Sequence, residues 1–445
     1  MPKVTVIMPS LNVVPYIRQC IESVLSQTLE DIEILAVDAG SMDGTLEILK
    51  EYETADKRLT VINSDQKSYG RQVNMGLELA KGEYISIVET DDRIAEDMYE
   101  NLYAAARSQH LDFAKGRGMF FIDLKNGSQW QMPIWLPISD DRVGSVVSPS
   151  NMPEILERDV FLWNGIYQRD FLKHIRFHES EGAAFQDQGF LLQTISTAKR
   201  AVYLDKTVYY YRQDNSGSSV VNPKGFHFLT GEYAYMKQFL AGKDEIWTRM
   251  YYLRMMKQCF GRYRSMVMKG EFWEAATEDI LTLRKWLEVA YHCGFLKDDI
   301  VSSKDMEILK IFLKSERAAF DYLLEEFRGK TAPLRQMLNA IQNREVVVFG
   351  AGAVGRFVQA LLENRECGRV AAFCDNDVAL QGEVVQGTCV YSPIEAVEKY
   401  PKAVFLITGI KQPEAMREQL RETAGRELCI YKYAPEMEMR LFLLE

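Results

Sequence analysis

The first 115 residues alternate short runs of β-forming residues with stretches of helical periodicity. Strand-like runs at 4–8 and 32–37 flank a helical pattern over 16–26, and the alternation continues to a strand-like run at 84–88. This order is typical of βαβ units, which place helices against the faces of a mostly parallel sheet. The sequence therefore predicts an α/β fold for this part of the chain.

The pattern changes twice further along the chain. Strand signals at 118–123 and 202–211 stand among Pro- and Gly-bearing loops, and beyond residue 223 apolar side chains recur every three or four positions, which predicts helices. Strand signals resume at 346–349. A length of 445 residues accommodates three domains. We therefore predict an α/β domain over 1–222, a helical region over 223–335 and a second α/β domain over 336–445.

Charge and cysteine content exclude several classes of protein. The chain has 53 Lys and Arg against 63 Asp and Glu, a net charge of −10, so its overall field does not attract nucleic acid. Its seven cysteines include no CxxC pair, which favours reduced thiols over a disulfide framework. No apolar run reaches the roughly 18 residues of a membrane span. We expect a cytoplasmic protein without a nucleic-acid partner.

Acidic residues follow two of the predicted strands. Asp38 comes directly after the second strand, and Glu89, Asp91 and Asp92 follow the fourth. In open α/β sheets ligands bind beyond the carboxyl ends of the strands, so these carboxylates are expected to face one crevice. Carboxylates so close repel one another unless a divalent cation or polar groups bind them. A phosphate-bearing substrate would need such a cation as a bridge.

Seven sequence blocks, in order, resemble the family 2 glycosyltransferases with a GT-A fold over residues 1–222. They are VIMPSLN (6–12), SVLSQT (23–28), EILAVDAGSMDGT (33–45), AKGEYISIVETDD (80–92), WNGIYQRDFL (163–172), FQDQGF (185–190) and VYYYR (208–212). Any one block would occur by chance, whereas seven in register are specific. The resemblance implies inverting transfer from a nucleotide-diphosphate sugar to a glycan or lipid-linked acceptor.

The resemblance also implies roles for individual residues. Glu89 and Asp91 fall at the acidic positions of the family's DxD motif, where a carboxylate binds Mn²⁺ or Mg²⁺ at the diphosphate. Asp187 falls at the aspartate of the ED motif and is the expected general base. Asp214 stands where some members place a metal-binding histidine. The remaining implied positions are Pro9, Asn12, Asp38, Arg71 and Asp92 for the donor, and Trp163, Asn164 and Arg212 for the acceptor or sugar.

The chain departs from the family pattern at several positions. Glu89 replaces the usual first aspartate, Ala39 stands where uridine-binding members often have a second aspartate, and Gln186 replaces the glutamate of the ED pair. A structural interpretation also stays open. Asp38 could cap the helix expected near Thr45, and the acidic turn could cap the helix expected from Glu96.

A glycine-rich turn opens the predicted C-terminal domain. Gly350, Gly352 and Gly355 lie directly between a strand and a helix, and Asp375 follows twenty residues after Gly355. In a dinucleotide-binding fingerprint such glycines let the backbone approach a pyrophosphate, and the acid reaches a ribose hydroxyl. The segment resembles Rossmann-like modules fused to bacterial sugar-modifying enzymes. It would bind NAD(P) or a nucleotide sugar, or serve only as a docking unit.

The segment 249–269 holds six basic residues, no acidic ones and several aromatic and Met side chains. This composition is typical of a helix lying on a membrane surface, and equally of a core helix with a solvated basic face. The first interpretation would place the protein at the inner face of the membrane.

The sequence thus predicts a metal-dependent glycosyltransferase of cell-surface polysaccharide synthesis. Two alternatives stay open: a NAD-dependent sugar oxidoreductase acting through the C-terminal domain, and a non-catalytic protein that binds nucleotide sugars.

Overall fold

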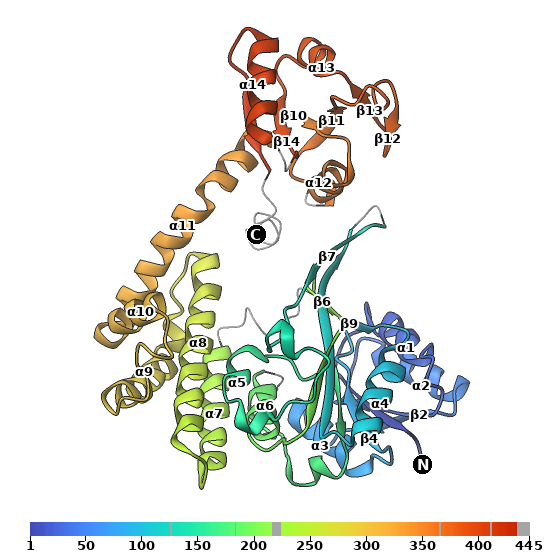
Figure 1. Cartoon of the computed structure of the whole chain (residues 1–445), viewed down its shortest axis with the longest axis vertical. Helices are drawn as coiled ribbons and strands as arrows, with labels where there is room; N and C mark the ends of the chain where they lie inside the picture. Colours follow the sequence, from blue (N-terminus) through green and yellow to red (C-terminus); the bar gives the residue numbers. More distant parts are fainter. Residues whose placement is uncertain (125–126, 183, 216–223, 365, 410–411, 434–445) are drawn as a thin grey trace. The chain divides into compact units, whose positions relative to one another are not determined.

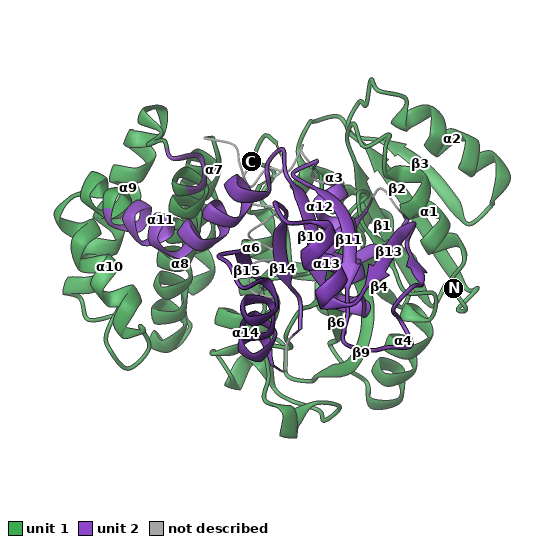
Figure 2. Ribbon diagram, turned by 90° about the horizontal axis from the view of Figure 1, so that it is seen from above, with its two compact units in different colours: residues 1–121, 131–267, 271–321 green, residues 122–130, 268–270, 322–445 purple. Residues whose placement is uncertain are grey.

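The computed structural model describes residues 1–124, 127–182, 184–215, 224–364, 366–409 and 412–433. The chain forms two compact units, coloured separately in Figure 2. The first comprises residues 1–121, 131–267 and 271–321, and the second comprises 122–130, 268–270 and 322–445. The predicted domain bounds 1–222, 223–335 and 336–445 stay predictions, and the helices up to residue 321 can be placed only by their compact unit. These helices belong to the same compact unit as the first sheet.

The first unit is built on a mixed β-sheet (Figure 1). Its path runs β3-β2-β1-β4-β8-β6-β9-β5, and β7 pairs with β6. β1 is parallel to β2 and β4, whereas β8 is antiparallel to β4 and β6. The strands are β1 (Val4–Ser10), β2 (Ile32–Asp38), β3 (Leu59–Asn63), β4 (Tyr84–Ile87), β5 (Arg93–Ile94), β6 (Phe113–Asp123), β7 (Gln129–Pro133), β8 (Gly165–Gln168) and β9 (Ala201–Arg212).

Helices alternate with these strands as the sequence pattern predicts. In the first helix Ile17, Cys20, Ile21 and Val24 are buried, a spacing that places them on one face. The helices of this part are α1 (Ile17–Leu25), α2 (Thr45–Ala55), α3 (Tyr69–Leu79), α4 (Met98–Gln109), α5 (Ile155–Arg158) and α6 (Gln186–Ile195). The predicted α/β fold of this region is confirmed, with β1 and β2 extending beyond the predicted bounds.

A helical segment continues the first unit. It comprises α7 (Gly225–Met236), most of α8 (Glu245–Lys269), α9 (Thr277–His292) and α10 (Ser303–Lys314). The first unit ends at residue 321, within α11 (Glu316–Ile341). The burial of 249–269 favours the core-helix interpretation over the membrane-surface one. The apolar side chains of α8 are buried against other helices, as where Tyr263 meets Phe312 at 5.6 Å between ring centroids. Arg254 and Arg262 are buried as well. No described helix is long and apolar enough to cross a membrane.

A buried ion pair joins β6 to the segment after α5. Lys115 Nζ donates to Asp159 Oδ2 at 2.7 Å and to the carbonyl of Phe161 at 2.7 Å, and Tyr203 also donates to Asp159 Oδ2. Lys115 is 1% exposed and Asp159 is 4% exposed. Burial lowers the pKa of Lys115, an effect that the charge of Asp159 opposes. Each charge therefore depends on the other to remain buried.

Lys115→Met is expected to lower the free energy of unfolding by about 3–5 kcal/mol, because it leaves the Asp159 carboxylate buried without its cation. Lys115→Met combined with Asp159→Leu should recover most of this loss, since the double variant contains no buried charge at the site. Urea denaturation of the three proteins measures the effect. A double variant no more stable than Lys115→Met would show that the segment depends on the charges themselves.

The second unit contains a sheet ordered β12-β13-β11-β10-β14-β15. β10, β11, β13, β14 and β15 are parallel, and β12 is antiparallel to β13. Leu334, Met337 and Ile341 at the end of α11 pack into its core. The elements are β10 (Glu345–Phe349), α12 (Ala353–Asn364), β11 (Arg369–Cys374), β12 (Val384–Val385), β13 (Thr388–Tyr391), α13 (Pro393–Lys399), β14 (Val404–Ile407), α14 (Pro413–Ala424) and β15 (Cys429–Lys432).

Candidate functional site

The carboxyl ends of β1 and β2 are fixed by a buried side chain of α3. Gln72 Nε2 donates to the carbonyl of Ser10 at 2.9 Å and to that of Val37 at 2.6 Å. Because both carbonyls lie at the ends of their strands, this amide sets the position from which the following turns start. α3 itself begins after Ser68, whose hydroxyl caps the backbone NH of Arg71.

The acidic turn after β4 is held by β9. The hydroxyl of Tyr209 donates to Asp92 Oδ2 at 2.8 Å and accepts from the backbone NH of Glu89. Arg212 donates from its backbone NH to Asp92 Oδ1 and from Nε to the carbonyl of Asp91. Asp92 is therefore a buried brace, whereas the side chain of Asp91 remains partly exposed.

A pocket of about 600 Å³ opens beside this turn. Its wall combines the acidic turn, the segment 160–163, the start of α6, the end of β9 and one face of α8, all in the first unit. The lining residues are Tyr69, Glu89, Asp91, Val160, Phe161, Leu162, Trp163, Ala184, Phe185, Gln186, Asp187, Gln188, Tyr211, Asn215, Gln258, Gly261, Arg262 and Ser265. The pocket combines acids with aromatic rings, such as the Trp163 ring that stacks on Tyr209 at 4.0 Å between centroids.

Two carboxyl groups of the pocket have raised pKa values. Desolvation raises the pKa of Glu89 to about 8; a hydrogen bond from the Tyr69 hydroxyl (2.6 Å) opposes this, and the charges of Asp91 and Asp187 add to it. Desolvation also raises the pKa of Asp187, against the lowering effect of the charge of Arg254. A carboxylate with a raised pKa accepts a proton more readily than one in water. Asp187 therefore has the environment of a base, while Glu89 is largely protonated at neutral pH.

The pocket brings together only part of the predicted site. Glu89, Asp91, Trp163 and Asp187 line it. The other predicted donor, acceptor and metal positions do not: Pro9, Asn12, Asp38, Arg71, Asp92, Asn164, Arg212 and Asp214.

Several of these outlying residues have structural partners. Asp38 is fully buried and accepts from the backbone NH groups of Gly40 and Ser41, so it braces the turn after β2. Arg71 pairs with Asp65 at 2.9 Å and lies 3.6 Å from Glu179. Asn164 donates to the carbonyl of Gly116. Their contacts with a donor or acceptor stay predictions.

The turn around Asn12 is likewise closed by local hydrogen bonds. Asn12 Oδ1 accepts from the backbone NH of Met42, and the carbonyl of Pro9 accepts from the hydroxyl of Thr90. These bonds tie the ends of β1, β2 and β4 together. In this structure Asn12 and Pro9 therefore hold the carboxyl ends of these strands together.

The metal-binding roles of Glu89, Asp91 and Asp214 stay predictions. Among the described residues no group of three or more His, Cys, Asp and Glu side chains is placed to hold a metal ion. Asp214 pairs instead with Arg212 at 3.1 Å. The partly exposed Asp91 of the pocket fits a divalent cation, which can bind through one carboxylate together with substrate phosphates and water.

Sequence reasoning missed the part of the pocket that α8 contributes. Gln258, Gly261, Arg262 and Ser265 line it from a helix whose periodicity gave only a core pattern. Tyr69 and Gln188 were also missed, although Tyr69 lies two residues before Arg71 and Gln188 lies within the FQDQGF block. No family block covers α8, so only the fold reveals this wall.

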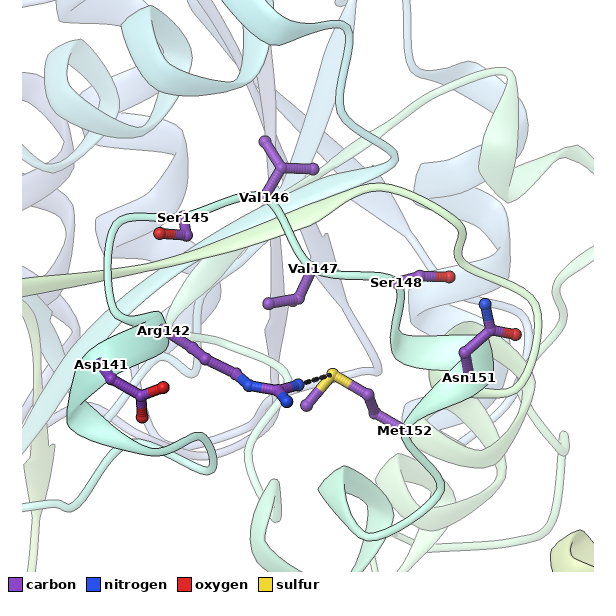
Figure 3. Close-up of a pocket in the computed structure, with 8 residues that line it drawn as sticks. All are labelled: Asp141, Arg142, Ser145, Val146, Val147, Ser148, Asn151 and Met152. Atoms are coloured by element: carbon purple, nitrogen blue, oxygen red, sulfur yellow. Dashed lines mark hydrogen bonds between the residues drawn. The ribbon is translucent and has the colours of Figure 1, made fainter.

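Figure 3 shows a second hollow of about 430 Å³, formed by residues 141–152. Arg142 and Met152 point toward each other across it, with 3.2 Å between Nη1 and Sδ. No predicted site residue lines this hollow, and it holds one acid and one base. It offers no chemistry that the larger pocket lacks.

The glycine-rich turn of the second unit lies between β10 and α12. Gly350 has φ +115°, and a Cβ on Gly355 would lie 1.8 Å from the carbonyl oxygen of Gly350, so both positions need glycine. A Cβ on Gly352 would meet nothing within 4 Å. Asp375 Oδ2 accepts from the backbone NH of Ala351 at 2.8 Å and its Oδ1 accepts from that of Asp377. In this structure Asp375 thus braces the turn, and its predicted ribose contact stays untested.

Comparison with known proteins identifies the first part of the chain. Residues 5–168 match the family described as Glycosyl transferase family 2, so the chain contains a domain of that family. Glycosyltransferase GlyA of Streptococcus pneumoniae serotype 4 is 30% identical over 241 residues, 51% of this chain and 33% of GlyA. EpsJ of Bacillus subtilis, an uncharacterized glycosyltransferase, is 30% identical over 220 residues, 48% of this chain and 62% of EpsJ. The chain spans less than two thirds of either relative.

A solved structure shares the fold. The crystal structure of S. aureus TarS 1–349 in complex with UDP-GlcNAc has a TM-score of 0.55 at 20% identity, covering 74% of this chain and 92% of that chain. At this identity the likeness establishes a GT-A-like fold and nothing about specificity.

Proposed function

We propose that the protein transfers a sugar, with inversion, from a nucleotide-diphosphate sugar to a hydroxyl of a glycan or lipid-linked acceptor in polysaccharide synthesis. The observation that carries this proposal is that one pocket holds both Asp91, which lies within the residues that match glycosyltransferase family 2, and Asp187, which follows them. The two carboxylates come from different elements, the turn after β4 and the start of α6. This arrangement suits one acid for the leaving group and another for the attacking hydroxyl.

The residues divide the chemistry as follows. Asp91 would hold a divalent cation at the donor end of the pocket, and that cation would neutralise the charge that develops on the leaving group. Asp187 accepts the proton of the attacking hydroxyl, and its raised pKa suits that task. Trp163 and Tyr211 present aromatic surface on which the apolar face of a sugar can pack. The largely neutral Glu89 adds little negative charge beside the diphosphate.

A donor screen tests the proposal. UDP-GlcNAc is the first probe, because the TarS structure that shares this fold contains it; other UDP-, GDP- and TDP-sugars follow, each with Mn²⁺. A donor that binds the native state raises the melting temperature with its concentration. Release of the nucleoside diphosphate, measured with and without an oligosaccharide acceptor, then shows turnover. Binding without any release, for every donor and acceptor pair, would favour a non-catalytic nucleotide-sugar-binding protein.

A second proposal concerns the C-terminal unit, which we infer binds a nucleotide at its glycine turn. The open space at Gly352 beside the start of α12 favours this, because a pyrophosphate could approach the backbone there. NAD(H), NADP(H) and UDP-GlcNAc are the probes. Oxidation of a sugar with reduction of NAD⁺ by the full chain would instead support the oxidoreductase alternative.

Gly352→Val is expected to abolish nucleotide binding to the C-terminal unit while leaving the melting temperature near that of the wild type, because the side chain enters open space. Gly355→Ala should instead lower the melting temperature, because its Cβ overlaps the Gly350 carbonyl. Calorimetric titration of the full-length chain measures binding. Undiminished binding by Gly352→Val would remove the proposal, since the ligand would then lie elsewhere.

A further inference from the structure

Arg254 of α8 is buried within hydrogen-bond reach of the pocket wall. Its side chain is 3% exposed, and its Nε donates to Gln188 Oε1 at 2.5 Å. Gln188 Nε2 in turn donates to Asp187 Oδ2 at 2.9 Å. Because a guanidinium only donates, it fixes the carbonyl side of this amide, and the NH₂ must then face the carboxylate. The hydrogen bonds therefore run in one direction, from Arg254 to Gln188 and from Gln188 to Asp187.

The same guanidinium holds a second wall of the pocket. Arg254 Nη1 donates to the carbonyls of Leu156 and Asp159, the latter at 3.0 Å. Asp159 directly precedes residues 160–163, which line the pocket. Arg254, a buried cation of α8, therefore holds both α6, which carries Asp187, and the segment that carries Trp163.

The charges around Asp187 leave Arg254 as the cation that acts on it most. Lys115 is paired with Asp159, so it balances another acid. Arg254 lowers the pKa of Asp187, and Asp187 reciprocally favours the charged form of Arg254. The other charged or titratable groups that interact with Asp187 or share its pocket are Glu89 and Asp91 of the acidic turn, Tyr69 of α3, Tyr211 of β9, Glu232 and Tyr233 of α7, and Arg262 of α8.

We propose that Arg254, acting through Gln188, is a positioning residue that orients the Asp187 carboxylate and keeps it ionised for catalysis. This deepens the proposed function and rests on it. Residue 254 lies beyond residues 5–168, so the helical segment contributes to the reaction centre of the domain that precedes it. α8 then has a role in the chemistry besides its role in packing.

The first experiment needs no substrate. Melting temperatures of wild type, Asp187→Asn, Arg254→Met and the double variant are measured from pH 4.5 to 8.5. A carboxyl whose folded pKa is raised stabilises the fold at low pH, and this advantage disappears as pH rises from the unfolded pKa through the folded one. The difference in melting temperature between wild type and Asp187→Asn should therefore change with pH. The pH midpoint of this change should lie roughly one unit higher when Arg254→Met is compared with the double variant.

The second experiment measures catalysis, with UDP release from UDP-GlcNAc and Mn²⁺ as the probe. The acid limb of kcat should move to higher pH by roughly one unit in Arg254→Met. The donor KM should stay within about twofold, since Arg254 lies behind the base. Arg254→Lys keeps the charge and should restore most of the wild-type pH profile.

Lys257→Met is the matched control. Lys257 lies about one turn further along α8 and forms an ion pair with Glu157 of α5, so it too ties α8 to this segment. Its hydrogen bond in the described part of the chain goes to Glu157 rather than to Gln188, and its loss should leave both pH midpoints unchanged. If Arg254→Met does not fold, Gln188→Leu breaks the same relay and should raise the midpoint in the melting experiment.

The outcomes separate the inference from the proposed function. An unchanged melting midpoint in Arg254→Met, or in Gln188→Leu where the first does not fold, overturns the role of Arg254 whether or not any donor reacts. A raised midpoint without turnover on any donor supports the coupling of Arg254 to Asp187 and counts against the transferase proposal instead. Equal shifts in Lys257→Met would make the effect a general property of α8 and would also overturn the inference.

Discussion

Asp187→Asn is expected to lower kcat for sugar transfer by roughly 10²- to 10⁴-fold, the range for loss of a general base. Asparagine keeps the size of the side chain but cannot accept the hydroxyl proton. The donor KM should stay near that of the wild type, because the proposed function places the diphosphate at Asp91 rather than at Asp187. Initial rates at varied donor concentration separate the two constants. In the wild type, kcat should rise with pH through a value above the ordinary pKa of aspartate, since the base acts when ionised.

Glu181→Gln is the control for this substitution. Glu181 is an exposed acid shortly before α6, so its replacement removes a negative charge from the same segment without changing the pocket. It should keep the wild-type kcat. A rise in donor KM that matches the fall in kcat for Asp187→Asn would instead make Asp187 a donor-binding group.

The sheet could be predicted from sequence because its signals are local. Each strand of residues 1–88 is a short β-rich run, and β1 is buried along its whole length. Asp91 and Asp187 could be singled out from the sequence, because each stands in one of the blocks that follow one another in the order found in the family. The acids after the second and fourth strands were expected to face one crevice. Glu89 and Asp91, which follow the same strand, line the pocket, whereas Asp38 of the other strand does not.

The sequence does not show which groups a polar side chain forms hydrogen bonds with. Asp38 stands at a strand end in both interpretations, and only its hydrogen bonds to Gly40 and Ser41 show that it braces the turn. Asp375 has backbone partners for the same reason.

The basic residues of α8 show the same limit for positively charged side chains. Six positive charges among apolar residues suggested a membrane face, yet Arg254 and Arg262 are buried. A buried arginine stays in place because polar oxygens accept its NH groups. The acceptors of Arg254 on Gln188 of α6 and Leu156 of α5 lie 66 and 98 residues earlier in the chain. No helical periodicity encodes contacts at that separation.

Asp91→Asn is expected to reduce transfer about a thousandfold or more. A divalent cation supplies several kcal/mol of charge stabilisation in the transition state, and each 1.36 kcal/mol is about tenfold in rate. The amide oxygen of asparagine carries no net charge and binds such a cation weakly. Loss should appear in both metal affinity and kcat, measured by titrating Mn²⁺ at saturating donor.

Asp214→Asn separates this assignment from the three-carboxylate site that the sequence suggested. Asp214 pairs with Arg212, which also holds the carbonyl of Asp91, so its replacement should loosen that arginine without removing a ligand. A partly exposed ion pair contributes about 0–1 kcal/mol, and the expected loss of rate is therefore less than about tenfold. If Asp214→Asn loses as much metal affinity as Asp91→Asn, both carboxylates bind the cation in the working enzyme. If Asp91→Asn keeps wild-type turnover at saturating Mn²⁺, the acidic turn is not the metal site.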